Sequence, residues 1–376
     1  MGFTGVHGAN DYHLGSSSPL LDMGNPDSPS IDDLSGQPRP QGAGFEPGPY
    51  EYAVHTPFAP TVTLPKWPQN KKAALVLRFD DGTPGQAQLG IPALSRRKLT
   101  GTWYINPGRD IYPPNRSLWE TAPSLNQELA NHTMNHREVS GEELMQKEVE
   151  DAAREIWRIR GHAFNGSLMS FCLSTESVWP WTSTLKDQIL GSLSNVDHQA
   201  YPGLTYAGYV NYSVPTGANS DMMYAIVPRI IESGNWGRVS FHGITAVAGA
   251  SDWGVGAVHI DELNQFLDKV LAVTGDVWVA GQIQLYKYMQ EQQRSTVTIT
   301  DAYSDRVAFN LNASLSTLYD EPLALVVGLP AFWARCQVEQ GSRVVVYDVR
   351  ADHTALVYAV PNQGEIVVTQ AQAAAQ

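Results

Sequence analysis

Residues 71–82 read Lys-Lys-Ala-Ala-Leu-Val-Leu-Arg-Phe-Asp-Asp-Gly, and this stretch decides the fold prediction. Its continuous apolar run is typical of a strand that is buried on both faces of a sheet. The run leads directly into Asp80-Asp81-Gly82, so two carboxylates are expected at the carboxyl end of that strand. Barrels of alternating strands and helices place their functional residues at this end of the strands. The stretch therefore predicts both a parallel sheet and the position of a functional site.

The chain that follows alternates predicted strands with predicted helices. The segment 141–160 is the clearest helix, because its apolar residues recur with the 3.6-residue period of an amphipathic helix. Further strands are expected at 101–106, 238–242 and 276–280, and further helices at 261–273 and 283–294. This alternation predicts a parallel α/β domain over residues 71–294.

Segments of different composition flank this domain on both sides. Residues 1–70 form a Gly/Pro-rich arm with no helical or alternating apolar pattern, and such a segment cannot fold alone. We expect its second half to lie on the next domain. Residues 295–376 hold short alternating segments separated by Asp, Asn and Gly turns, which predicts a small antiparallel β-sandwich.

The charge of the chain excludes some classes of partner. The 376 residues carry 38 acidic and 25 basic side chains, for a formal net charge of −13. Proteins that bind nucleic acids usually present a basic patch, and the Lys and Arg residues here are scattered, so no nucleic-acid partner is expected. No apolar run reaches the roughly 18 residues of a membrane helix, so no membrane span is expected either. The oligomeric state stays open.

The amino terminus and the glycosylation tripeptides bear on location. The first residues, MGFTGVHGANDYHLG, lack the basic start and the apolar core of a secretory signal. Five Asn-x-Ser/Thr tripeptides nevertheless favour a secreted origin. We expect a secreted protein whose signal lies outside the present sequence, with a cytoplasmic protein as the alternative.

Two histidines have the spacing of a metal-binding pair. In His132-Thr-Met-Asn-His136 the imidazoles are four residues apart, which would place both on one face of a helical turn and suits a divalent metal such as zinc. Zinc peptidases with this spacing carry a Glu base directly after the first His, where this chain has Thr133. The base and a third ligand must therefore come from elsewhere.

The adjacent residues Asp80 and Asp81 can meet both needs. Neighbouring side chains at a strand end point in different directions, so one carboxylate can bind the metal while the other takes a proton from water. His242 ends another predicted strand and can protonate a leaving group, because imidazole titrates near neutral pH. Cys172 and Cys336 are the chain's two cysteines, which excludes a cysteine-rich metal site.

Phe79-Asp80-Asp81-Gly82, His132-Thr-Met-Asn-His136 and Ser240-Phe-His242 follow one another in this order. Together they resemble the motifs of the polysaccharide deacetylases, the NodB-homology or carbohydrate esterase family 4 group, over about residues 71–294. The resemblance implies a distorted (β/α) barrel that removes N- or O-acetyl groups from sugars. It also implies site roles: Asp80 as catalytic base, Asp81, His132 and His136 as metal ligands, and His242 as catalytic acid.

The chain departs from this family at several positions. Arg78 stands where the family usually has Thr or Ser. The family's Arg-Pro-Tyr motif has no counterpart in residues 170–181, which leaves open what orients the base. For the Asp and Trp that buttress the catalytic His, Asp221 and Trp236 are candidates, whereas Asp252-Trp253 comes after His242 along the chain.

Aromatic residues could form the floor of a sugar groove, because their faces stack on pyranose rings, although core packing is the alternative. The candidates for substrate binding are Trp103, Trp179, Trp181 and Trp236, with Tyr104 and Trp253 as further aromatic residues of the same kind.

We therefore expect a metal-dependent hydrolase that removes acetyl groups from an oligo- or polysaccharide, with one divalent ion as cofactor. Zinc is the expected ion, with cobalt or nickel as alternatives. A hydrolase acting on a non-sugar C–N bond, such as an imide, formamide or ureide, is the second hypothesis, motivated by the missing Arg-Pro-Tyr motif. A carbohydrate-binding protein with a relic site is the third.

Overall fold

A computed structural model describes Leu14 and residues 18–25, 27, 31–34, 39–40, 43–52, 57–173, 179–199 and 211–371. The chain divides into two compact units. One, here called the α/β unit, contains Leu64–Ser295 and Ala313–Ala324. The other, called the β unit, contains the described residues up to Thr63, Thr296–Asn312 and the chain from Leu325 onward.

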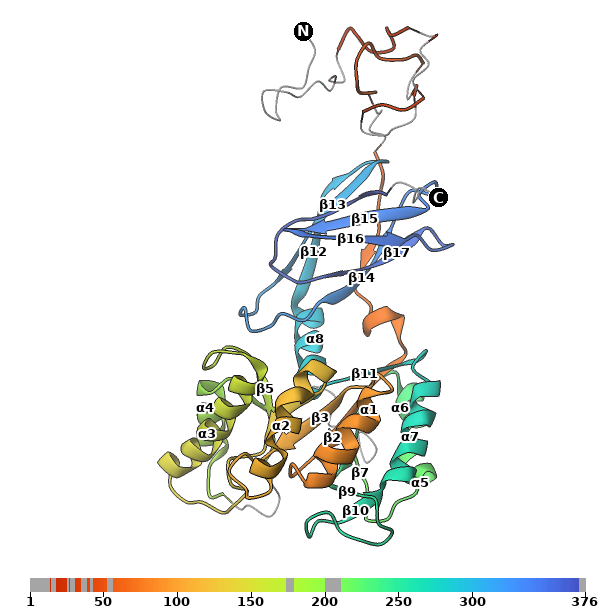
Figure 1. The fold of residues 1–376 in the computed structure, drawn as a ribbon. Coiled ribbons are helices and arrows are strands. Elements are labelled where there is room, and N and C mark those ends of the chain that lie inside the picture. Colours follow the sequence, from red (N-terminus) through yellow and green to blue (C-terminus); the bar gives the residue numbers. More distant parts are fainter. Residues whose placement is uncertain are drawn as a thin grey trace. The chain divides into compact units, whose positions relative to one another are not determined.

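The α/β unit is built on a sheet of eight strands, all of whose pairings are parallel (Figure 1). Seven strands follow the order β6-β5-β4-β3-β2-β8-β7, and β11 pairs with the first half of β2. The strands are β2 (Ala73–Phe79), β3 (Gly101–Ile105), β4 (Glu128–Asn131), β5 (Met169–Phe171), β6 (Asn195–Asp197), β7 (Asn211–Ser213), β8 (Trp236–Phe241) and β11 (Val277–Ala280). The predicted distorted (β/α) barrel is thus confirmed.

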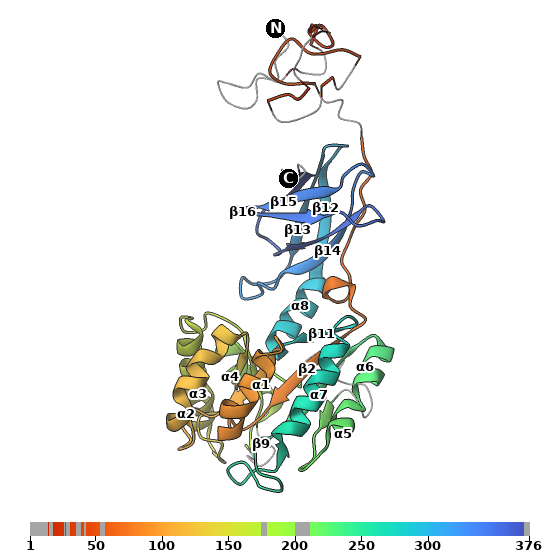
Figure 2. The same ribbon diagram turned by 45° about the vertical axis from the view of Figure 1, so that its right-hand side comes forward.

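Helices connect these strands and cover the sheet. In Figures 1 and 2, α2, α3 and α4 lie together on one flank, and α5, α6 and α7 lie on the other. The helix α3 begins after Gly141 and ends at Gly161, whose φ of 72° suits a glycine helix end. The helices are α1 (Ile91–Ser95), α2 (Tyr112–Thr121), α3 (Glu142–Arg160), α4 (Ser183–Ser192), α5 (Ser220–Tyr224), α6 (Val227–Ser233), α7 (Ile260–Ala272) and α8 (Gln282–Arg294).

One face of the central strand β2 packs in the core, and the other face lies toward the candidate site. All seven of its residues are buried, as the apolar run predicts. Phe79 stacks on Trp103 and on Phe241, with ring centroids 4.0 and 4.8 Å apart, and so belongs to the core. Because side chains alternate along a strand, Arg78 and Asp80 point to the opposite side from Phe79. This alternation delivers both charged side chains to the site described below.

The β unit consists of two antiparallel sheets, which confirms the predicted small all-β fold. The strands β12, β13, β18, β15 and β16 form one sheet, and β1, β14 and β17 form the other. Their bounds are β1 (Val62–Thr63), β12 (Ser295–Ala302), β13 (Arg306–Ala313), β14 (Leu323–Gly328), β15 (Arg335–Gln340), β16 (Arg343–Asp348), β17 (Thr354–Ala359) and β18 (Ile366–Gln370). A short parallel pair, β9 (Gly243–Thr245) with β10 (Ala257–His259), belongs to the α/β unit.

The strand β15 was not predicted from the sequence. β15 reads Arg-Cys-Gln-Val-Glu-Gln, in which Cys336 and Val338 are the only apolar residues. It forms a strand because it pairs along its length with β16 and with β18. Tertiary pairing therefore overrides a weak local preference for strand.

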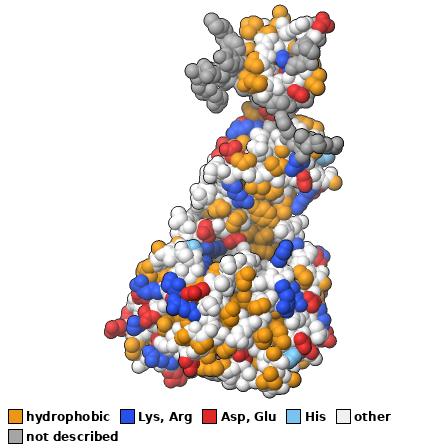
Figure 3. All heavy atoms as spheres, in the orientation of Figure 1, with side chains coloured by type: hydrophobic (Ala, Val, Ile, Leu, Met, Phe, Trp, Pro, Cys, Tyr) orange, Lys and Arg blue, Asp and Glu red, His pale blue; other side chains and the backbone are white. Residues whose placement is uncertain are grey.

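The surface carries charge of both signs. On the face of the α/β unit that Figure 3 presents, basic and acidic side chains are interspersed. Among the described residues, no helix is long and apolar enough to cross a membrane.

Candidate metal and catalytic site

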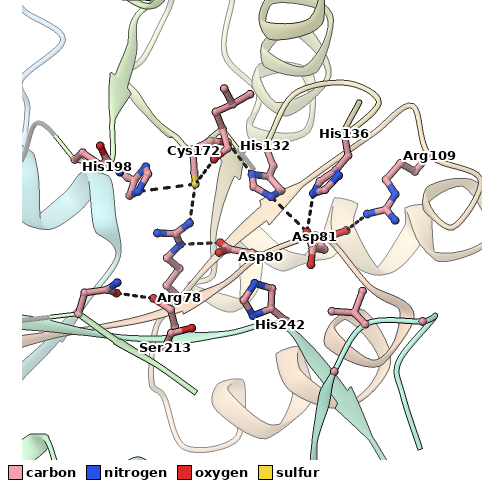
Figure 4. A pocket seen from close by; sticks show the side chains of 17 residues that line it. Arg78, Asp80, Asp81, Arg109, His132, His136, Cys172, His198, Ser213 and His242 are labelled. Atoms are coloured by element: carbon pink, nitrogen blue, oxygen red, sulfur yellow. Dashed lines mark hydrogen bonds and ion pairs between the residues drawn. The ribbon is translucent and has the colours of Figure 1, made fainter. Parts of the chain in front are cut away.

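A cavity of about 550 Å³ opens beyond the carboxyl ends of β2, β4 and β8. Because parallel strands end at the same edge of a sheet, residues distant in sequence meet there. The five residues to which the motifs assign chemistry all line this cavity (Figure 4): Asp80, Asp81, His132, His136 and His242.

Asp81, His132 and His136 form a cluster with the chemistry of a metal site. Asp81 Oδ1 lies 3.0 Å from His136 Nε2 and 3.4 Å from His132 Nε2. One ligand atom from each residue lies within 4.8 Å of the other two. His136 Nε2 is buried, and Asp81 is the described group that it faces. One carboxylate and two imidazoles that converge in this way fit a divalent ion such as zinc.

A backbone contact fixes the ring of His132. Its Nδ1 lies 2.7 Å from the carbonyl oxygen of Cys172, which can only accept a hydrogen bond. Nδ1 therefore carries a proton, and Nε2 is the ring nitrogen that faces Asp81. Donation of the outer ring N–H to a carbonyl is the usual support of a metal-binding histidine.

The predicted helical turn for the two histidines is wrong. The strand β4 ends at Asn131, helix α3 begins only at Glu142, and the histidines lie on the bend between them. Thr133 and His136 adopt left-handed φ angles of 69° and 52°. The Asn131 side chain accepts from Thr133 N at 2.9 Å and donates to Val149 O, so a side-chain contact replaces a helical hydrogen bond.

Arg78 holds the side chain of Asp80 and is therefore the residue that orients the candidate base. Its Nε donates to Asp80 Oδ1 at 2.7 Å, and its Nη2 donates to Cys172 Sγ at 2.7 Å. The guanidinium carbon also lies 4.8 Å from the ring centroid of Tyr104. Arg78 and Asp80 are 6% and 7% exposed, so the ion pair is screened little by water.

The pair of carboxylates is ionised at neutral pH. Burial opposes ionisation of Asp80, but Arg78, His132 and His242 together hold the pKa of its carboxyl below the ordinary value. Burial likewise opposes ionisation of Asp81, and the imidazoles of His132 and His136 hold its pKa well below the ordinary range. Asp80 can therefore accept a proton at neutral pH.

His242 follows β8 and faces the two carboxylates from the other side of the cavity (Figure 4). The fully buried Gln86 donates from Nε2 to the carbonyl oxygens of both Asp80 and His242. Asp252 joins the loops behind them, because its carboxylate accepts from Ile244 N at 3.0 Å and from Gly85 N at 3.1 Å. The motifs gave no signal for Gln86, and Asp252 was set aside in the sequence analysis because it follows His242 along the chain.

Cys172 takes part in a further polar chain that the sequence analysis did not identify. Its Sγ lies 4.0 Å from His198 Nε2, and His198 Nδ1 lies 3.3 Å from Asp197 Oδ1. Burial raises the pKa of the thiol, but Arg78 and His198 outweigh burial and lower it to about 5. Cys172 is therefore both a buried side chain and a hydrogen-bond partner of Arg78.

The structure buries three of the four tryptophan candidates, Trp103, Trp179 and Trp236. Trp103 is fully buried between Phe79 and Trp119, and Trp236 is 2% exposed in a separate apolar cluster with Trp67. A ring enclosed by the core cannot stack on a sugar, so neither lies in a groove. The candidate buttress Asp221 has a side chain that is 87% exposed and pairs with Lys269 on the surface.

Trp179 and Trp181 lie edge to face, with their ring centroids 4.9 Å apart. Trp179 is 5% exposed and donates from Nε1 to Arg137 O at 3.0 Å. Trp181 lines a smaller cavity of about 200 Å³, which shares Leu173, His198 and Gln199 with the main one. Residues 174–178, which belong to the segment where the sequence lacks the family's Arg-Pro-Tyr motif, lie outside the described residues.

The site and fold together define a parallel α/β protein with an Asp-His-His cluster beside an ionised aspartate. No family model matches the sequence, and no curated protein matches it. Comparison with solved structures finds similar chains. The peptidoglycan deacetylase PdaC from Bacillus subtilis has 15% identity, with 60% of this chain and 94% of that chain covered, at a TM-score of 0.39.

Two further similar structures are esterases. A family 4 carbohydrate esterase from Streptomyces lividans, in complex with acetate, has 15% identity and a TM-score of 0.35, with 55% of this chain and 92% of that chain covered. A family 4 acetyl xylan esterase from Clostridium thermocellum, with a cobalt ion, has 13% identity and a TM-score of 0.38, with 57% and 90% covered.

Proposed function

We propose that this protein is a metal-dependent hydrolase that removes acetyl groups from a carbohydrate. The observation that carries the proposal is the convergence of three groups in one cavity. They are the Asp81-His132-His136 cluster, the Arg78-held carboxylate of Asp80 and the imidazole of His242. A metal site, a base and an acid are the parts that hydrolysis of an ester or amide requires.

Asp81, His132 and His136 would hold the ion, and this ligand set favours zinc. A divalent ion bound there would make water acidic and would polarise the acyl carbonyl. The carbonyl of Cys172 keeps His132 in the tautomer that leaves Nε2 available. This support comes from the chain itself and does not depend on the identity of the ion.

Asp80 would act as the base. Water adds to the acyl carbon as its proton passes to Asp80, whose low pKa keeps it ionised beforehand. Arg78 fixes the direction of the carboxylate, so the proton acceptor does not rotate away from the water. His242 donates a proton to the departing nitrogen or oxygen as the C–N or C–O bond breaks. Acetate and a free amine or alcohol are the products.

The same groups would also cleave a non-sugar amide, so the first experiment compares substrates. Acetate release is measured from chitooligosaccharides and from acetylated xylan, and ring opening is measured with small cyclic amides, before and after chelation. We expect acetate release from the sugars that stops on chelation and returns with zinc. Turnover of the cyclic amides alone would reject the sugar substrate in favour of a non-sugar amidohydrolase.

Variants separate an enzyme from a binding protein with a relic site. Asp81→Asn should abolish zinc binding and acetate release, whereas His162→Gln, which changes an exposed histidine, should leave both unchanged. A protein that binds sugar equally well with and without Asp81, and that never releases acetate, would be a binding protein.

A further inference from the structure

A second arginine lies at the edge of the candidate site. Arg109 follows β3 and lines the cavity, and its Nη1 lies 3.4 Å from the backbone oxygen of Asp81 (Figure 4). Its guanidinium carbon is 4.2 Å from the ring centroid of Trp253. Arg109 is thus held between a candidate metal ligand and an aromatic ring, and neither contact belongs to the proposed acetyl transfer to water.

A tight turn presents Trp253 to this arginine. Asp252 and Val255 exchange two backbone hydrogen bonds of 3.0 and 3.1 Å, and Trp253 and Gly254 adopt φ angles of 50° and 80° between them. A bulky residue rarely adopts a left-handed conformation, and Trp253 is also 44% exposed. The turn is anchored through the buried carboxylate of Asp252, which accepts from Ile244 N. The turn therefore holds the indole outside the core in a backbone conformation that is strained for a bulky residue.

The charge of the cavity would depend on a bound ion, because the two guanidinium groups and two carboxylates that line it balance one another. Among the described lining residues, the carboxylates of Asp80 and Asp81 face the guanidinium groups of Arg78 and Arg109. Arg78 is committed to Asp80. A divalent ion at Asp81 would leave this cavity positive, although the whole chain carries a net charge of −13. Such a cavity favours an anionic substrate.

We propose that Arg109, positioned by Trp253, binds a carboxylate on the substrate, so that the acetylated sugar is a uronic acid or an oligosaccharide containing one. A guanidinium matches a planar carboxylate with two parallel hydrogen bonds, and a cation held against an aromatic ring keeps that orientation. Because Arg109 also contacts the backbone of Asp81, a substrate carboxylate bound by Arg109 would lie beside the acyl group of the same substrate. This inference rests on the proposed function and names the substrate class for the same site.

Binding to the chelator-treated protein tests the inference without turnover and without coordination of the carboxylate to a metal. The probes are an N-acetylglucosamine disaccharide and the same disaccharide oxidised at C6 to the carboxylate, compared by calorimetry at low salt. We expect the carboxylated sugar to bind at least about tenfold more tightly, as for a charge-assisted hydrogen bond. Arg109→Gln should bring the ratio to within about twofold, and Trp253→Ala should reduce it by about threefold.

A matched arginine on a ring provides the control. Arg154 lies 4.0 Å from the ring centroid of Phe164 on the surface of α3, and it does not line the cavity among the described residues. Arg154→Gln and Phe164→Ala should leave the affinity ratio unchanged. The zinc-loaded protein should show the same preference in kcat/KM, and Arg109→Gln should remove that preference.

The outcomes separate this inference from the proposed function. Equal affinity of the unaltered protein for both disaccharides, or a preference that survives Arg109→Gln, would overturn the anion site. Acetate release without that preference would overturn the anion site alone. Carboxylate-selective binding that depends on Arg109, in a protein that never releases acetate, would support the anion site and defeat the proposed function.

Discussion

Arg78 lies on β2 and Asp80 directly follows that strand, and their side chains meet in the same cavity, with Nε 2.7 Å from Oδ1. The period of two along a strand brings them to one face. Each is almost fully buried, and Arg78 has a second partner in Cys172. One strand therefore supplies both the candidate base and the group that orients it.

The first prediction concerns this orientation. Arg78→Lys should lower kcat about a hundredfold while zinc affinity changes by less than about threefold, because an ammonium is a point charge that cannot reach Asp80 and Cys172 together. Steady-state kinetics and zinc titration measure the two effects. Arg238→Lys is the control, since Arg238 is also buried on the neighbouring strand β8 but makes its Nε contact with Asn211. An unchanged kcat in Arg78→Lys would show that the pair does not position the base.

The second prediction concerns stability. Arg78→Met should destabilise the protein by about 3–5 kcal/mol, because it leaves the carboxylate of Asp80 buried without a partner. The double variant Arg78→Met/Asp80→Asn should recover a large part of this loss, since it removes both charges. Denaturant unfolding measures the free energy of each variant. A double variant that is less stable than the single one would argue against an electrostatic origin.

The third prediction concerns His242 as the acid. His242→Gln should slow the release of acetate from an N-acetyl sugar by about 10²-fold or more, because the amine leaves only when protonated. With 4-nitrophenyl acetate, whose leaving group needs no proton, the loss should stay within about tenfold. Comparison of kcat/KM for the two substrates gives the result. An equal loss on both substrates would assign His242 a role other than protonation.

Much of this site could be predicted from sequence because its parts follow the carboxyl ends of strands in one parallel sheet. Asp80 and Asp81 directly follow an unbroken apolar run, and His242 ends another strand, so the parallel sheet brings them to one edge. The role of Arg78 was also within reach, because a charged residue two positions before Asp80 must share its face. The family resemblance instead predicts the orienting arginine within residues 170–181, where this chain has none.

Other features depend on tertiary contacts that cannot be predicted from the local sequence. His132 and His136 converge on a bend shaped by the Asn131 side chain, although their spacing favours a helical turn. Trp103 and Trp236 have the chemistry of sugar-binding residues, yet the core encloses them. Arg109 gave no local signal, because its neighbour Trp253 lies far along the chain. The domain boundaries predicted at 70 and 294 stay predictions.

The fourth prediction uses a buried acid outside the site. Burial raises the pKa of Glu291 on α8 to about 8, whereas an unfolded Glu titrates near 4.5. The folded state therefore holds a proton that the unfolded state has lost, and stability falls as pH rises between these values. Glu291→Gln removes this loss. The Tm of the variant minus the Tm of the unaltered protein should therefore increase as pH rises from about 5 to about 8.5.

The control for this prediction has the opposite sign. A hydrogen bond from Arg158 lowers the pKa of Glu155, so its contribution to stability is present above the unfolded pKa and is lost at low pH. Glu155→Gln should therefore lose Tm relative to the unaltered protein as pH rises through the acid range. Thermal unfolding of both variants across pH would contradict the account if the two shifts had the same sign.

Acetate release during a zinc titration tests the central claim most directly. Chelator-treated protein receives increasing zinc while acetate is measured from an N-acetylated oligosaccharide. The proposed site of Asp81, His132 and His136 predicts activity that starts from zero, rises in proportion to zinc and levels off at one ion per chain. Acetate release that is full before zinc is added, or that stays absent at every zinc concentration, would contradict it.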